Sequence, residues 1–250
     1  MPFFHGFYVS LHIKYVYEIM SCILNIETST NVCSVSLSQD GVCLHEEVDF
    51  QGPSHAQVLA GYVKEAISFA DSHAIPIDAV AVSKGPGSYT GLRIGVSEAK
   101  GVAYARDAKL LSVETLKLLT VPVLLGHDEL PDDALLCPMI DARRMEVYCA
   151  VYDRALHEIE PTRALVIDEN SFKELLDKHP IYFMGNGADK CTETIKHSNA
   201  HFITGIVPRA KNMIPLAEKA MACEQFEDVA YFEPFYLKEF VATKSKNHLI

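Results

Sequence analysis

The spacing of hydrophobic and polar residues along the first half of the chain predicts a layered arrangement of strands and helices. Short apolar runs, some alternating with small polar residues, indicate strands at 22–26, 32–37, 42–48, 79–82 and 110–113. Longer apolar-periodic stretches indicate helices at 55–72, at 89–106 and from about 114. Ser54 is expected to cap the first helix, and Ser88 or Thr90 the second, because a hydroxyl there satisfies a free first-turn amide.

The second half of the chain repeats this pattern after a linker that contains Pro122 and residues 126–133. Strands are expected at 134–140, 145–152, 164–167, 181–184 and 201–206. Helices are expected at about 170–178, at about 189–196 and from about 214. Each half therefore runs strand, acidic turn, strand, strand, helix, strand, helix, with almost no sequence identity between the halves. This order is typical of an α/β protein built from two related lobes.

The repeated order also gives the expected domain boundaries. Residues 20–125 are predicted to form an N-terminal lobe and residues 126–212 a C-terminal lobe, with a tail at 227–250. A C-terminal helix at about 213–226 is a candidate for packing back on the N-terminal lobe.

Cysteine usage and the first residues both favour a cytoplasmic protein. The cysteines lie at positions 22, 33, 43, 137, 149, 191 and 223. They form no C-x-x-C pair, and most are in apolar strand-like runs, which predicts buried reduced thiols. Residues 1–19 are interpreted as an extension with no role in the fold, since Met20 directly precedes a well-formed strand. The pattern of this extension matches neither a membrane helix nor a secretory signal.

Composition and net charge limit the kinds of ligand that the chain is expected to bind. Hydrophobic residues make up 49% of the 250 residues and charged residues 22%, as in ordinary globular proteins. The net charge of −11 argues against a broad nucleic-acid groove, because phosphate contacts need clustered Lys and Arg. A small anionic ligand remains compatible with the chain, since backbone amides can bind one without side-chain charge.

Two turns are candidates for a nucleotide site. The first joins two predicted strands and consists of Glu27, Thr28, Ser29 and Thr30, whose hydroxyls and amides can face an anion. The second consists of Gly185, Asn186 and Gly187 and can offer another cradle across a cleft. The alternative is two ordinary tight turns. Neither the P-loop nor the G-x-G-x-x-G pattern occurs in the chain.

The sequence gives weaker support to a metal site and to a catalytic nucleophile. His197 and His201 are four residues apart, a ligand spacing on one helix, but the residues between them favour a helix end that leads into a strand. His55 is interpreted as a surface or capping residue. Ser88 lies on a strand-to-helix turn without the G-x-S-x-G pattern, so turn and cap chemistry explains it better than a nucleophile. We therefore expect no catalytic or metal-ligating residue.

The two long helices are candidates for a protein interface. Gly91, Gly95 and Gly101 each cost the second helix roughly 1 kcal/mol relative to alanine, which suggests that another backbone packs very close to it. The apolar residues of helix 55–72 cover more than one stripe. The alternative is packing on the chain's own sheet. The interface is expected at Leu59, Tyr62, Val63, Ile67, Tyr89, Leu92, Arg93, Gly95, Val96 and Ala99. A large charged residue at Gly95 or Val96 is expected to abolish association and leave the fold intact.

Several segments carry a resemblance to a known family. The stretch GPGSYTGLRIGVSEAKGVAYA resembles the signature of the bacterial TsaB (YeaZ) family. Further similar segments, in the same order, are ILNIETSTNVCSVSLSQDG, SHAQVL, MIDARRMEVYCAVYD, FMGNGA and the tail motif from Pro234 to Lys238. The resemblance covers roughly residues 20–240.

The resemblance implies a fold and a set of partners. The fold is that of the actin, Hsp70 and sugar-kinase (ASKHA) superfamily, with two βββαβα lobes and a nucleotide cleft between them. The partners are the catalytic paralogue TsaD, joined through helices 54–72 and 89–106 in a four-helix bundle, and the ATPase TsaE. A homodimer is implied when the partner is absent, and contact with tRNA is left mostly to the partners. ATP or ADP is possible at the cleft or at the partner interface, and no membrane is involved.

The resemblance also implies a non-catalytic role in threonylcarbamoyl transfer to N6 of adenosine 37 in tRNA. The catalytic paralogue holds a metal with an H-x-x-x-H pair just after the glycine helix and its following strand. The matching place here, residues 111–116, contains no histidine. Glu27 stands where many relatives carry aspartate, a departure that bears on nucleotide binding.

Three alternatives remain open at this point. A free-standing ATP-dependent kinase of the same superfamily predicts ATP hydrolysis and tight nucleotide binding at Thr28 and Gly187, although Asp141 is the one evident acidic metal-binding residue. A metalloprotease predicts bound zinc. A plain binding module predicts an unrelated partner.

Overall fold

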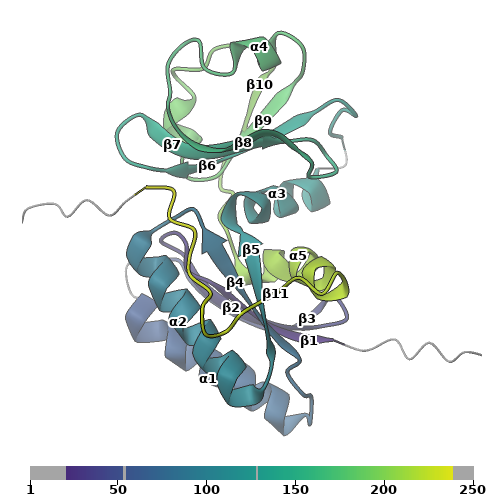
Figure 1. Ribbon diagram of the computed structural model, residues 1–250. Coiled ribbons are helices and arrows are strands. Elements are labelled where there is room, and N and C mark those ends of the chain that lie inside the picture. Colours follow the sequence, from purple (N-terminus) through teal and green to yellow (C-terminus); the bar gives the residue numbers. More distant parts are fainter. Residues whose placement is uncertain (1–20, 53–54, 128, 239–250) are drawn as a thin grey trace, which may run out of the picture.

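The computed structural model describes residues 21–52, 55–127 and 129–238, which form two α/β lobes, one above the other in Figure 1. The predictions for residues 1–19, for Ser54 and for residues 239–250 lie outside the described residues. Each lobe contains a mixed sheet, and in each the chain runs through three antiparallel strands and then helix, strand and helix. The predicted α/β fold with two lobes is confirmed.

The N-terminal lobe contains a six-stranded sheet in the order β11-β5-β4-β1-β2-β3. Its strands are β1 (Cys22–Glu27), β2 (Cys33–Gln39), β3 (Val42–Asp49), β4 (Ala79–Gly85), β5 (Lys109–Glu114) and β11 (Phe226–Glu227). The first three pair antiparallel, and β4 pairs parallel with β1 and β5. Because β4 and β5 run in the same direction, their carboxyl ends lie at the same edge of the sheet.

Helices cover both faces of this sheet. Side chains alternate between the faces along a strand, so Leu24 and Ile26 of β1 pack on α1 (His55–Ser72) and α2 (Tyr89–Arg106). Ile23, which points the other way, packs with residues of α5 (Ala210–Ala222). Helix α3 (Thr115–Gly126) lies between the lobes, since Leu118 contacts the cluster of α5 whereas Leu116 contacts the C-terminal lobe (Figure 1).

Ser88 determines where α2 begins. Its side-chain oxygen accepts a hydrogen bond from the Gly91 amide at 3.2 Å, so of the two predicted capping residues it is the one that caps. The helix ends at Asp107, which has φ of 52° and closes the last turn through a bond from its amide to the Ala103 carbonyl. The predicted bounds of this helix, 89–106, are confirmed.

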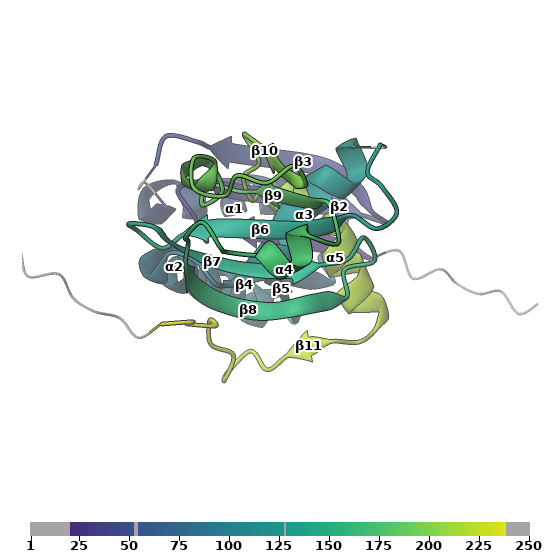
Figure 2. The ribbon, with the colours of Figure 1, turned by 90° about the horizontal axis from the view of Figure 1, so that it is seen from above.

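The C-terminal lobe contains a five-stranded sheet in the order β10-β9-β6-β7-β8 (Figure 2). Its strands are β6 (Leu135–Asp141), β7 (Glu146–Tyr152), β8 (Glu158–Val166), β9 (Ile181–Met184) and β10 (Ala200–Ile203). The helical segments are α4 (Lys173–Leu176) and the 3-10 turn η1 (Asp189–Cys191). Cys137, Val147 and Phe183 are fully buried in its core, against Phe172 and Leu176 of the α4 segment.

Several predicted elements of this half of the chain are wrong. Pro122 lies inside α3 and not in a linker. Proline cannot donate the backbone hydrogen bond at this position, but the burial of the nearby Leu119 and Val123 stabilises the helix around it. Helix 189–196 is reduced to the three residues of η1, and helix 170–178 to the four of α4. Strand β8 is longer than predicted and contains Pro161, which an edge strand tolerates.

The end of the chain returns to the N-terminal lobe. Helix α5 packs on β1, β2 and β5, and β11 pairs antiparallel with β5, a strand that the sequence pattern did not predict. Residues 228–238, here called the tail segment, then run along α2 toward the C-terminal lobe (Figure 1). The Phe235 amide donates to the Lys84 carbonyl at 2.7 Å, and Lys238 pairs with Glu146 of β7 at 2.5 Å. The tail segment therefore links the two lobes.

Candidate functional site

The turn between β1 and β2 is buried, and its side chains bond within the turn and to α2. Glu27 is fully buried, and its Oε1 accepts hydrogen bonds from both the amide and the hydroxyl of Ser29, each at 2.5 Å. Burial raises the pKa of Glu27, and the hydrogen bonds from Ser29 offset part of that rise. Thr28 is equally buried, and its hydroxyl donates to the Gly91 carbonyl at 2.8 Å.

Helix α2 packs directly on this turn. A β-carbon on Gly87 or Gly91 would overlap the carbonyl oxygens of Ser29 or Thr28, and one on Gly95 would overlap the Thr28 hydroxyl. The close partner that these glycines indicate is therefore the turn of the same chain and not a second molecule. Gly101 differs, because a β-carbon there meets no atom within 4 Å among the described residues.

His55, the first residue of α1, also contacts this turn. Its Nε2 lies 2.7 Å from the Thr30 carbonyl oxygen, and the residue is 7% exposed. The interpretation of His55 as a surface or capping residue is therefore wrong. The contact joins the start of α1 to a residue 25 positions earlier, which sequence spacing cannot indicate.

The second predicted turn is fixed to the end of β6. The Gly187 amide donates to the Met139 carbonyl at 3.0 Å, and Asn186 Oδ1 accepts from the Asp141 amide at 3.1 Å. Gly185 has φ of +94°, and side chains at either glycine would overlap the β6 backbone. The glycines thus allow close packing of two backbones.

The residues of the first turn do not fit a nucleotide phosphate. A phosphate site needs backbone amides or hydroxyls that point into free space. The Ser29 donors are already bound to Glu27, and Thr28 and Ser29 have no exposed surface. We therefore derive no step that uses a nucleotide at this turn.

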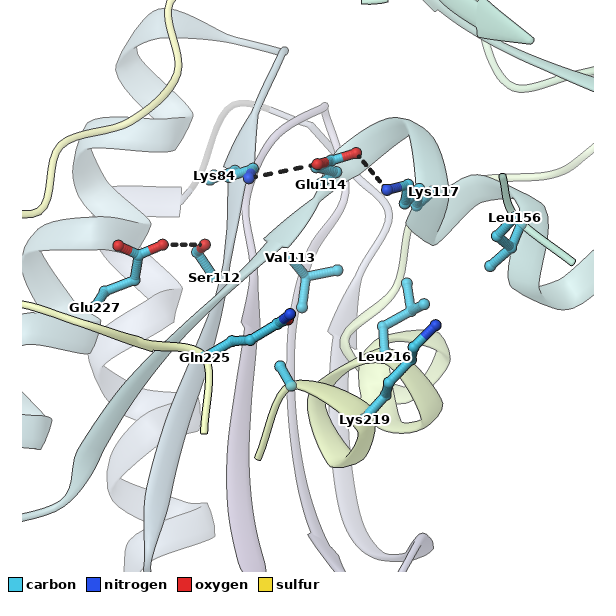
Figure 3. A pocket seen from close by; sticks show the side chains of 11 residues that line it. Lys84, Ser112, Val113, Glu114, Lys117, Leu156, Leu216, Lys219, Gln225 and Glu227 are labelled. Carbon is cyan, nitrogen blue, oxygen red and sulfur yellow. Dashed lines mark hydrogen bonds and ion pairs between the residues drawn. The ribbon is translucent and has the colours of Figure 1, made fainter. Parts of the chain in front are cut away.

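A pocket of about 400 Å³ lies where β4 and β5 end (Figure 3). Its charged lining residues are Lys84, Glu114, Lys117, Lys219 and Glu227. Glu114 lies between two lysines, 3.5 Å from Lys84 Nζ and 3.2 Å from Lys117 Nζ. Crevices outside the carboxyl ends of parallel strands are common ligand sites. Sequence spacing did not reveal this cluster, because its charged members come from five elements: β4, β5, α3, α5 and β11.

Lysine and glutamate occupy the place where the catalytic paralogue is expected to carry its histidine pair. Glu114 ends β5 and Lys117 lies in the first turn of α3. Ion-paired lysines are poor ligands for a metal, since an ammonium group has no lone pair to donate. His197 and His201 do not replace the pair: His197 Nε2 is 3.4 Å from Asp177 and the His201 ring stacks on Tyr182.

The structure separates the predicted interface residues into two groups. Six of them are buried in the chain's own core: Leu59, Val63, Leu92, Gly95, Val96 and Ala99. Tyr62 and Ile67 pack at the edge of the same core, and the Tyr89 ring contacts the Tyr236 ring of the tail segment at a tilt. Arg93 is exposed. The wide apolar band of α1 is explained by contacts with β2, β3 and α2, so the buried members are not available to a partner.

The outward faces of the two helices carry mostly small and polar side chains. On α1 the exposed positions include Ala56, Gln57, Ala60, Gly61 and Lys64, and on α2 they include Arg93, Ser97, Gly101, Tyr104 and Ala105. Tyr104 is 84% exposed, an unusual degree for an aromatic side chain. These positions define what we call the outer helix face.

All seven cysteines are free thiols, of which five are buried. Burial raises the pKa of Cys22 and Cys33 to about 12, so these thiols stay protonated and unreactive at neutral pH. Among the described residues, no helix combines the length and the apolar character needed to cross a membrane.

Comparison with known proteins agrees with this architecture. The sequence profile of the family described as "TsaD: tRNA N6-adenosine threonylcarbamoyltransferase" matches residues 50–246. The Escherichia coli (strain K12) protein named tRNA threonylcarbamoyladenosine biosynthesis protein TsaB is 29% identical over 89% of this chain and 96% of its own length. The Bacillus subtilis (strain 168) protein of the same name is 28% identical over 66% of this chain and 70% of its own length. A solved structure described as "YeaZ from Pseudomonas aeruginosa" has a TM-score of 0.74 at 25% identity, over 87% of this chain and 100% of that one.

Proposed function

Because the chain belongs to the TsaD family, described as tRNA N6-adenosine threonylcarbamoyltransferase, and within it to the TsaB (YeaZ) group, we propose that it is the non-catalytic subunit that pairs with a TsaD-like paralogue. It takes part in tRNA threonylcarbamoyladenosine biosynthesis. In this proposal the paralogue transfers the threonylcarbamoyl group to N6 of adenosine 37, and the present chain stabilises the active form of that partner. A TsaE-like ATPase is the third member.

The outer helix face supports the pairing. Gly61 and Gly101 are exposed on helices where each costs roughly 1 kcal/mol relative to alanine. The chain's own packing does not require either one, since a β-carbon at both positions meets no described atom within 4 Å. Small residues on adjacent helices allow the helices of a partner to approach closely. This face, and not the buried residues first predicted, is the proposed interface.

The chemistry of the pocket and of the turn supports a role without catalysis. The lining of the pocket at β4 and β5 holds a carboxylate neutralised by two lysines where the paralogue is expected to hold a metal. The Ser29 amide and hydroxyl already bind Glu27. The turn therefore offers no free Ser29 donor to a phosphate, and the Glu114 carboxylate of the pocket is already paired. We therefore assign the transfer chemistry, and any ATP or ADP that it needs, to the partners.

The same face accounts for the other expected associations. Two copies of this chain present identical patches and can pair about a two-fold axis, so we propose a homodimer when the paralogue is absent. A net charge of −11 disfavours direct binding of a polyanion, so the partners supply most of the contact with tRNA.

Reconstitution tests this proposal. The purified chain, a TsaD-like subunit and a TsaE-like subunit are combined with unmodified tRNA, ATP and a preformed activated threonylcarbamoyl donor, and N6-threonylcarbamoyladenosine is quantified. We expect product when all three proteins are present and none when either this chain or the TsaD-like subunit is omitted. Product formed without the TsaD-like subunit, or ATP turnover by the isolated chain that requires Thr28, would instead favour the kinase-like alternative.

A further inference from the structure

A group of metal-ligating side chains lies at the edge of the N-terminal lobe, away from the pocket and from the buried turn. His45 and Glu47 are two residues apart on β3, so both point to the face of the sheet that α1 covers. Glu65 comes from α1. One ligand atom from each of the three side chains lies within 4.8 Å of the other two. Two elements that are not adjacent in sequence therefore converge on one point.

The imidazole of His45 is held in place but lacks a hydrogen-bond partner. Its ring stacks on Phe69 of α1, with ring centroids 5.6 Å apart. Its Nε2 is buried and has no hydrogen-bond partner among the described residues, although Glu47 Oε1 lies 3.5 Å away. A buried ring nitrogen without a partner is costly, and a bound cation would satisfy it.

The carboxylates around this nitrogen are not neutralised by a basic side chain. Glu65 is exposed and forms no ion pair within the described part of the chain, and the ion pair of Glu47 there is with His45. Glu46, whose side chain points to the opposite face, is the residue of this strand that binds Arg209. The local charge at this point therefore favours a cation.

We propose that His45 Nε2, Glu47 and Glu65 bind a divalent transition-metal ion of the zinc class, with the fourth position open to solvent. Imidazole nitrogen and carboxylate oxygen are both ligands that zinc accepts, whereas calcium and magnesium prefer oxygen ligands alone. The ion would join the edge strand β3 to α1, whose outward face forms the proposed interface. This inference does not depend on the proposed function.

The test uses the full chain after treatment with a chelator and dialysis. Zinc binding is measured by titration calorimetry, and tetrahedral geometry by the visible absorption of the cobalt(II) form. We expect one zinc ion per chain, with affinity lowered about tenfold or more in His45→Ala and in Glu65→Gln. Glu65→Gln is the decisive variant, because Glu65 is exposed and its change leaves the packing of the metal-free chain intact.

His73→Ala is the matched control. His73 also stacks on Phe69 and directly follows α1, but it is not one of the three ligands. We expect this variant to bind zinc as the unmodified chain does. The proposal is overturned if Glu65→Gln binds zinc with unchanged affinity, if His73→Ala weakens binding as much as His45→Ala, or if no binding occurs. In those cases His45 and Glu47 form an ordinary ion pair.

Discussion

Gly95 of α2 lies against the side chain of Thr28, so close that a β-carbon at position 95 would overlap the Thr28 hydroxyl oxygen. We therefore predict that Gly95→Ala lowers the free energy of unfolding by roughly 1–3 kcal/mol, the usual cost of overpacking. Urea denaturation monitored by circular dichroism measures this change. The earlier expectation, that a charged residue at Gly95 or Val96 leaves the fold intact, conflicts with the burial of both residues.

Gly101 provides the matched comparison on the same helix. Its missing β-carbon faces open space, so Gly101→Ala is predicted to raise stability by up to about 1 kcal/mol through helix propensity alone. Equal destabilisation by alanine at both positions would show that the close contact with Thr28 does not determine the effect.

The buried carboxyl group of Glu27 predicts a specific dependence of stability on pH. Its pKa is raised above 4.5 in the folded chain, so folding favours the protonated acid. This contribution is fully present below the unfolded pKa and is lost as the pH rises through the folded pKa. Glu27→Gln, which is always neutral, is therefore predicted to be more stable than the unmodified chain at neutral pH and similar to it near pH 4. Denaturation midpoints over this range measure the difference, and a constant difference would contradict the prediction.

Lys100 is predicted to hold the tail segment on α2. Its Nζ donates to the carbonyls of Ala230 and Phe232, at 3.1 and 3.0 Å. Lys100→Met retains the aliphatic stem and removes both bonds, which corresponds to a loss of about 1–2 kcal/mol. Hydrogen exchange at the Phe235 amide, which donates to Lys84, should then accelerate about five- to thirty-fold. Lys64→Met, at an exposed position of α1, is the control and should leave this rate unchanged.

Local signals in the sequence were sufficient to predict most strands and helices of the N-terminal lobe. The hairpin at Gln39-Asp40-Gly41 and the hydroxyl of Ser88 fix strand and helix ends by short-range chemistry. Pro122 misled the prediction because a local rule was outweighed by burial of its helix between two lobes. Strand β11 has only two residues and depends on pairing with β5, more than a hundred positions earlier. No periodicity reveals such a strand.

The candidate site was harder to predict for the same reason. The sequence located the turn from Glu27 to Thr30 but gave no sign that Glu27 would bind the Ser29 donors. The glycines of α2 correctly indicated a close backbone, yet a single sequence cannot say whether that backbone belongs to the same chain. The ion-paired cluster around Glu114 and the ligands at His45 and Glu65 arise from tertiary contacts between distant elements.

The central claim is that the chain acts by binding a TsaD-like partner through the outer helix face. The most direct measurement is the dissociation constant of that complex for Gly101→Arg, compared with Ala222→Arg, an exposed position on α5 at the other face of the sheet. Both variants are first checked to be folded and to unfold at a temperature no lower than the unmodified chain. We predict that Gly101→Arg weakens the complex about a hundredfold or more, with a parallel loss of tRNA modification, and that Ala222→Arg changes neither. Wild-type affinity in a folded Gly101→Arg variant would contradict the account.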